Sequence, residues 1–314
     1  PPPLDQLWTD PVLRLTAAEY LMAHTWYGGE AFPYFDPHLG PCSLAAYLGG
    51  HPVWEEYSVW FSPVLPDLTA APPLRLDPDN LYWRAQQAIV AHAAAAAHGR
   101  YLVAFPDVCE NVDILASLRG TTEFLIDMAL CPNAVQQRLA ELNIAYNHVF
   151  AHLHPFINDS HGGNCVSVFD IWGPGRTIKV QCDLAGMISP RMFNELVVPA
   201  LVQQCQSYDY VLFHLDGSQA LPHLDTLLQL DCIDAIEWTP EPGAPWGGSP
   251  RWYDLYRKIL AAGKSVQAVF VALEEAEPLL QAVGSQGLFL MLRAPDETTG
   301  RRLLDRLERY RPRG

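Results

Sequence analysis

From about residue 80 onward, short apolar runs alternate with longer segments in which apolar residues recur at helical spacing. The runs predict strands buried on both faces, at 101–107, 166–172, 210–216, 234–238, 265–271 and 287–293. The longer segments predict helices at 81–99, 121–131, 133–153, 189–205, 219–230, 250–263, 273–284 and 295–310. Capping signals agree with this pattern, because Asp79 or Asn80 can cap one helix and Ser189 with Pro190 opens another.

The first 80 residues are less regular and are rich in aromatic residues and prolines, as in 26–42 and 51–67. Six clear strand–helix units and two irregular ones predict an α/β protein, a single (β/α)8 TIM barrel. We expect one domain over 1–314, with irregular loops over 1–80 and regular units over 81–310. An open doubly wound sheet is the alternative, but no Gly-x-Gly-x-x-Gly turn follows any strand, which disfavours a dinucleotide site.

Charge and composition narrow the classes of partner. Of the 314 residues, 35 are acidic and 20 basic, giving a net charge of −15, the opposite of a nucleic-acid-binding surface. The sequence has no uninterrupted run of 18 apolar residues, so we expect no membrane span. Its first residues do not resemble a signal peptide. The seven cysteines are scattered without a CxxC pair, which is typical of reduced thiols. We therefore expect a cytoplasmic protein with a small-molecule substrate, and leave a homodimer open.

Ionisable residues end two successive strands in the segment FHLDGSQALPHLDTLLQLDCIDAIEW. His214 and Asp216 share one strand face because side chains alternate, and Glu237 ends the next apolar run. In a barrel of parallel strands, chemistry occurs at the strands' carboxyl ends. We therefore expect Asp216, Glu237 and His214 to form one catalytic site, although an Asp after a strand is often only a turn former or a helix cap.

Further strand-end residues are candidates for contacts with the substrate. Trp172 and Trp238 offer flat apolar walls beside carboxylates. Other candidates are Asp107, Asp170 and Arg293, together with Cys182 and Asp183, which follow the glycine-containing segment GPGRTIKV, interpreted as a loop.

The run WGPGRTIKVQCDLAGMISPRMFNELVVPALVQQC, with YVLFHLDG, HLDTLLQL and IEW, resembles the uroporphyrinogen decarboxylase superfamily. That superfamily includes corrinoid- and coenzyme-M-linked methyltransferases. The resemblance covers roughly residues 80–310 and is strongest over 165–240. It implies a (β/α)8 barrel with its site at the carboxyl ends of the strands.

The sequence departs from both characterised branches. The decarboxylase branch holds a polycarboxylate with clustered arginines, whereas residues 1–80 contain only Arg14 and Arg75. The methyltransferase branch binds zinc through His-x-Cys, a Glu one strand later and a final Cys. His214 and Glu237 match this pattern, but Asp216 stands in place of the first Cys and GLFLMLRAP has none. The thiolate ligands that zinc-activated thiol chemistry prefers are therefore missing.

We first expect a hydrolase without a cofactor, in which Asp216 and Glu237 act as a carboxylate pair on a glycosidic bond. The alternative is a corrinoid-type methyltransferase in which His214, Asp216 and Glu237 bind one divalent metal such as zinc. A decarboxylase-type lyase and a non-catalytic barrel that binds a small molecule also remain open.

Overall fold

The computed structural model describes residues 2–311, and its centre is a parallel sheet with strand order β11-β10-β9-β8-β7. The strands are β7 Thr177–Gln181, β8 Tyr210–Asp216, β9 Ala235–Thr239, β10 Ser265–Val271 and β11 Leu288–Leu292. All neighbouring pairs are parallel, so the carboxyl ends of all five strands lie at one edge. This confirms the predicted α/β class.

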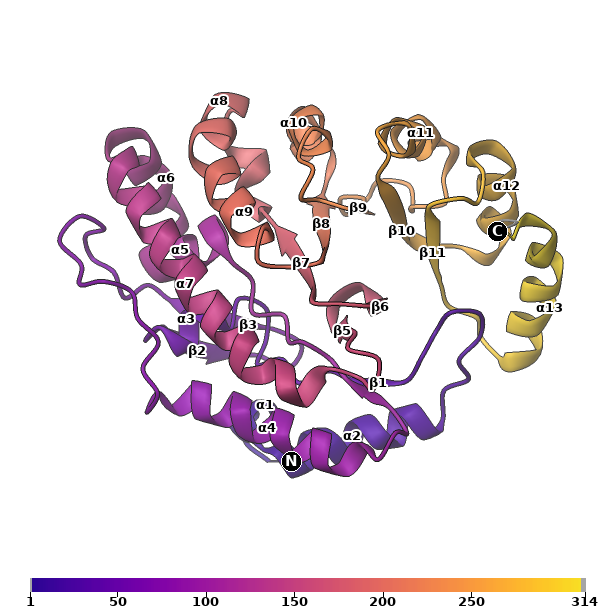
Figure 1. Cartoon of the computed structure of the whole chain (residues 1–314), viewed down its shortest axis with the longest axis horizontal. Coiled ribbons are helices and arrows are strands. Elements are labelled where there is room, and N and C mark those ends of the chain that lie inside the picture. Colours follow the sequence, from indigo (N-terminus) through magenta and orange to yellow (C-terminus); the bar gives the residue numbers. More distant parts are fainter. Residues whose placement is uncertain (1, 312–314) are drawn as a thin grey trace.

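Helices surround the sheet on its outer side, in an arc that Figure 1 shows from α6 to α13. Those that follow β7 are α8 Pro190–Met192, α9 Val198–Cys205, α10 Leu224–Leu228, α11 Tyr253–Ala261, α12 Leu273–Val283 and α13 Glu297–Leu307, with a π-helical turn Phe193–Val197 before α9. Alternate strand residues such as Ile236 and Trp238 are fully buried in the core. Trp238 meets Trp252, which precedes α11, at 4.9 Å between ring centroids. Apolar burial of this kind supplies the main stabilisation of the layered structure.

Three shorter strands, β1 Tyr34–Phe35, β4 Leu102–Val103 and β5 Asn164–Val166, continue the row of parallel strands on the side of β7. β1 pairs in parallel with β4, and a parallel bridge joins Phe105 to Val166 of β5. The Asn164 side chain then bonds the backbone N and O of Thr177 at the start of β7. Within residues 2–311 no pairing joins β11 to β1, so closure of the predicted barrel is not seen.

Two parts of the strand prediction are wrong. The run 166–172 is not one strand: β5 turns back through a 3-10 turn, Val168–Asp170, into the antiparallel β6 Ile171–Gly173. Phe169 and Asp170 have positive φ, which ends an extended strand. The segment interpreted as a loop, GPGRTIKV, instead contains most of β7. Its polar residues Thr177 and Lys179 are buried inside the molecule and hide the apolar pattern of a central strand.

The first 80 residues hold more regular structure than expected. They form α1 Leu4–Thr9, α2 Pro11–Ala23, α3 Leu44–Tyr47 and an antiparallel hairpin of β2 His51–Trp54 and β3 Val59–Ser62. Asp10 caps α2 through the backbone N–H groups of Val12 and Leu13, with Pro11 at the first helical position. The sequence Asp10-Pro11 is itself a helix-start signal.

The helices between β3 and β5 are α4 Leu81–Ala97, α5 Asn111–Arg119, α6 Thr121–Leu130 and α7 Pro132–Ile157. The prediction missed α5, which follows the shortened strand β4. None of the helices described here is long and apolar enough to cross a membrane.

Candidate functional site

A row of polar side chains crosses the inner face of the sheet. The strand registers pair Gln181 with His214, His214 with Glu237, and Glu237 with Gln267. Paired residues of parallel strands point to the same face, opposite to their neighbours in the chain. The four side chains therefore come from β7, β8, β9 and β10 at one level, while Trp238 faces the outer helices.

His214 is oriented by Glu237. Its Nδ1 hydrogen-bonds Glu237 Oε2, and Glu237 Oε1 accepts a hydrogen bond from the Thr239 hydroxyl at 2.7 Å. Burial raises the pKa of Glu237 above its usual range, and His214 only partly opposes this. Burial alone would lower the pKa of His214, but the bond to Glu237 outweighs it and raises that pKa. Because Nδ1 is occupied, only Nε2 is left for another partner.

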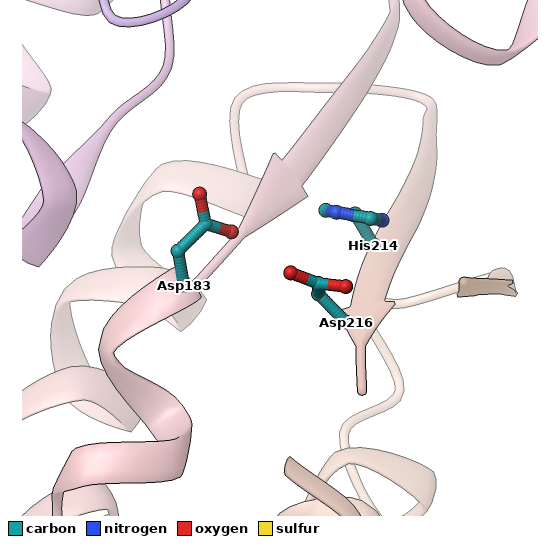
Figure 2. A group of neighbouring side chains, drawn as sticks. All are labelled: Asp183, His214 and Asp216. Carbon is teal, nitrogen blue, oxygen red and sulfur yellow. The ribbon is translucent and has the colours of Figure 1, made fainter. Parts of the chain in front are cut away.

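Two carboxylates lie beside this imidazole, as Figure 2 shows: Asp216 from the end of β8 and Asp183 from the residues that follow β7. One potential ligand atom from each of Asp183, His214 and Asp216 lies within 4.8 Å of the others. Both aspartates are exposed, whereas the His214 side chain is only 13% exposed. The three groups thus form a small cluster at the carboxyl edge of the sheet.

Hydrogen bonds with Gln181 and Asp113 hold Asp183 in place. Gln181 Nε2 donates to Asp183 Oδ2 at 2.9 Å and to Asp113 Oδ2 at 3.2 Å. The backbone N–H of Asp183 donates to both oxygens of Asp113, at 3.0 and 3.1 Å. Burial and the nearby charge of Asp183 raise the pKa of Asp113 to about 7. Although Asp183 is exposed as a residue, the surrounding protein partly desolvates its carboxylate and raises its pKa, while His214 and Lys179 oppose this.

A buried ion pair lies next to this network. Lys179 Nζ contacts Asp107 Oδ1 at 2.7 Å and also donates to Gln181 Oε1. Burial opposes both charges, but their mutual attraction outweighs it, so the pKa of Asp107 is lowered and that of Lys179 is raised. Glu110 accepts a hydrogen bond from the Gln181 backbone N–H, and burial raises its pKa to about 8.

Sequence reasoning grouped His214 and Asp216 with Glu237 and named Asp183 only as a separate candidate for substrate contact. It missed the residues that support the cluster: Lys179, Gln181, Asp113 and Glu110. The signal for Lys179 and Gln181 was the alternation of polar and apolar residues in TIKVQ, which is typical of a strand. Asp113 and Glu110 lie on or next to α5, the helix that was missed, so nothing linked them to the site.

Other candidates for substrate contact lie elsewhere. Trp238 is fully buried on the outer face, and Cys182 is buried in the apolar core, where burial raises its thiol pKa. Trp172 on β6 is 42% exposed and donates its indole N–H to Asp159. None of the three occurs in the cluster of Figure 2. Their placement gives no support to the predicted contacts.

Asp107 is engaged by Lys179, as described above. Asp170 accepts a hydrogen bond from the Tyr34 hydroxyl. Arg293 is exposed just beyond the end of β11. For Asp107, Asp170 and Arg293, contact with a substrate stays a prediction.

The geometry does not suit the expected carboxylate pair of Asp216 and Glu237. A glycosidase needs both carboxyl groups to face the substrate. Glu237 is 0% exposed and both its oxygens are engaged by His214 and Thr239, so it can orient His214 but cannot attack or protonate a substrate directly.

The cluster fits a divalent cation better. Ligand atoms about 2.1 Å from a tetrahedral cation lie about 3.4 Å from one another, so a spread of at most 4.8 Å requires only small side-chain movements. A histidine whose other ring nitrogen bonds a carboxylate is the usual arrangement of a metal-ligating histidine. The group that could hold a cation therefore contains Asp183 in place of the Glu237 expected from the sequence, and Glu237 lies behind His214.

No family model matches the sequence, and no curated protein matches it. A methyltransferase from Methanosarcina mazei is similar in structure, with a TM-score of 0.61 and 13% sequence identity, covering 97% of this chain and 86% of that chain. At this identity the likeness shows the fold alone, and it supports the superfamily resemblance only at that level. The structurally similar protein is a methyltransferase, which together with the buried Glu237 overturns our first expectation of a glycosidase-type hydrolase.

Proposed function

We propose that the protein transfers a methyl group to or from a small molecule, and that Asp183, His214 and Asp216 hold a divalent cation for this reaction. The fold likeness to a methyltransferase favours transfer, and the resemblance of 165–240 to the uroporphyrinogen decarboxylase superfamily is consistent with it. The finer fold belongs to the same proposal: β1, β4, β5 and β7 to β11 would be the eight strands of a (β/α)8 barrel.

The observation that carries the proposal is the hydrogen bond between His214 Nδ1 and buried Glu237. It selects the tautomer in which Nε2 carries a lone pair, and it makes that nitrogen a stronger electron-pair donor to a cation. Asp183 and Asp216 complete a set of one nitrogen and two carboxylates. Such a set, without thiolates, suits harder divalent ions than the sulfur-rich sites that select zinc.

A bound cation would supply Lewis acidity, lowering the pKa of a coordinated acceptor such as a thiol. The chain's own residues would keep the site in order. Glu237 fixes the ring of His214, and Gln181 fixes the carboxylate of Asp183. The buried Lys179 offsets part of the negative charge beneath them.

The alternative of a uroporphyrinogen-decarboxylase-like lyase has less support. That chemistry needs free cations for a polycarboxylate substrate. Arg176 precedes β7, at the opposite end of the strand from Asp183, and contacts Asp209 at 3.9 Å. Lys179 is already paired with Asp107. The described residues around the cluster therefore suit a cation better than a polyanion.

Cation binding can be tested directly by stripping the protein with a chelator and titrating it with Co²⁺, using calorimetry and visible absorption. We expect one ion per chain in the wild type. The variants Asp183→Asn and Asp216→Asn should each lose more affinity than the roughly 10- to 100-fold cost of a lost outer partner. Asp225→Asn, at an exposed aspartate paired with Lys258, is the matched control. Equal affinity in all variants would reject this ligand set.

Methyl transfer needs its own assay. The cobalt-loaded protein is mixed with methylcobalamin and 2-mercaptoethanol, and loss of the methylcobalamin absorption is followed. We expect transfer that depends on the cation and is lost in Asp183→Asn. Tight cation binding without transfer to this or to other simple thiols would retain the metal site but reject the reaction.

A further inference from the structure

The turn between β5 and β6 crosses in front of the inner face of the sheet and places an aromatic ring on His214. The Phe169 ring lies 4.8 Å from the His214 ring, centroid to centroid, with 36° between the planes. Figure 1 shows the hairpin inside the arc of helices rather than among them. Phe169 is only half-buried.

The backbone of this turn is unusual. Phe169 and Asp170 both have positive φ, 71° and 53°, a conformation that non-glycine residues rarely adopt. Two such residues in succession persist only where the surroundings hold them. The turn is therefore fixed by specific contacts and not by local preference.

Those contacts come from two sides. The Gln267 side-chain amide donates to the Phe169 carbonyl, and the Tyr34 hydroxyl bonds the Ser167 carbonyl at 2.9 Å and the Asp170 carboxylate. Gln267 belongs to the same inner row as Glu237 and His214. The row that orients the imidazole thus also sets the position of the phenyl ring.

The geometry points to Phe169 as a specificity-determining residue, whose ring limits the size of the group that can approach His214. This inference rests on the proposed function. A flat apolar surface beside the cluster favours a small, alkyl-bearing acceptor and disfavours bulky ones. In a hydrophobic pocket, one extra or missing methylene typically changes the discrimination between two substrates by about 10- to 200-fold.

Access to His214 can be measured without any cation. Metal-free protein is treated with diethyl pyrocarbonate, and modification of each histidine is followed by mass spectrometry. In Phe169→Ala we expect His214 to react several-fold faster than in the wild type. Tyr34→Phe, which loosens the turn, should give a smaller increase. Exposed His161 should react equally in all variants, and buried His223 should stay unmodified, which shows that the fold is intact.

Trp172→Ala is the matched control, because it removes an aromatic ring from the same hairpin at a residue bonded to Asp159 rather than to the turn. We expect His214 to react in it as in the wild type. An unchanged rate in Phe169→Ala, or an equal increase in Trp172→Ala, would overturn the proposal.

Selection by size is measured on cobalt-loaded protein with methanethiol and benzyl mercaptan as probes, through the thiolate-to-cobalt absorption. Phe169→Ala should improve the affinity for benzyl mercaptan relative to methanethiol by about 10-fold or more. Faster modification of His214 with an unchanged ratio would show that Phe169 covers the imidazole without selecting by size, and would overturn the inference. If the wild type binds no cobalt, the proposed function fails separately, and the inference of selection at that site falls with it.

Discussion

His214 and Glu237 face each other across β8 and β9, and the imidazole Nδ1 is hydrogen-bonded to the carboxylate. Glu237 has no exposed surface, so His214 is the route by which it can influence chemistry at the cluster. A carboxylate behind a histidine fixes the tautomer and raises the basicity of the free nitrogen. The pair thus fixes the imidazole, and the proposed ligands Asp183 and Asp216 lie beside it.

Glu237→Gln should weaken the site without removing a ligand. The negative charge of Glu237 contributes to the raised pKa of His214, so its loss should lower that pKa, measured by NMR of the metal-free protein. We expect cobalt affinity to fall by roughly 10- to 100-fold. Glu241→Gln, in which the lost carboxylate bonds Ser218 instead of His214, should leave both quantities unchanged. A His214 pKa that stays as high in Glu237→Gln as in the wild type would contradict the orienting role of Glu237.

The strands β8 to β11 were predictable because each is a nearly continuous apolar run with few polar residues, and such runs can be recognised from residue types alone. His214 and Asp216 followed from strand alternation. The position of Glu237 was predicted, but its role was not. Strand periodicity predicts the face of the sheet on which a side chain lies, and it does not predict its hydrogen-bond partner.

The remainder depended on contacts between distant segments. β7 looked like a loop because Lys179 and Gln181 are polar, and they become core residues only through Asp107, Asp113 and Glu110, roughly seventy positions earlier. The turn at Phe169 opposes its local preference and is fixed by Tyr34 and Gln267. The alternation in TIKVQ indicates a strand, but the local sequence does not show which distant residues Lys179 and Gln181 contact, and it does not show the turn at Phe169.

Gln181→Leu should release Asp183 while keeping the volume of the side chain. The wild-type amide donates to Asp183 and Asp113 and accepts from Lys179, so leucine removes all three contacts. We expect a loss of cobalt affinity of about 10-fold, the lower end for an outer partner. The comparison is Gln136→Leu, where the amide contacts only the Glu195 carbonyl. Unchanged affinity in Gln181→Leu would mean that Asp183 needs no support.

The Lys179–Asp107 pair should govern acid stability. The pKa of Asp107 is lowered in the folded state, so its contribution is present above the unfolded pKa of about 3.9 and is lost as pH falls through the lower folded value. Lys179→Met leaves a buried carboxylate unpaired and should cost about 3–5 kcal/mol of unfolding free energy at pH 7. Adding Asp107→Asn to that variant should recover part of the loss. Urea unfolding of the wild type, Lys179→Met, Asp107→Asn and the double variant, at pH 7 and at pH values below about 3.9, measures this. Additive losses would contradict a direct pair.

Glu110 should make the protein less stable as pH rises. Burial raises its pKa from the usual 4.5 to about 8, so between these values the folded state binds more protons than the unfolded state. Its contribution is therefore fully present below about pH 4.5 and declines as pH rises towards 8. Glu110→Gln keeps an oxygen that can accept from the Gln181 backbone N–H, and it carries no charge at any pH.

The unfolding free energy of Glu110→Gln should therefore fall less between pH 5 and pH 8 than that of the wild type. With a pKa raised from 4.5 to about 8, the variant should be more stable than the wild type at pH 8 by about 4 kcal/mol. Part of the slope should remain, because Asp113, with a pKa raised to about 7, titrates in the same window. The same change at exposed Glu274 should leave the slope as it is. Parallel curves for Glu110→Gln and the wild type would mean that Glu110 is ionised in the folded protein at neutral pH, with Lys179 shared between Glu110 and Asp107.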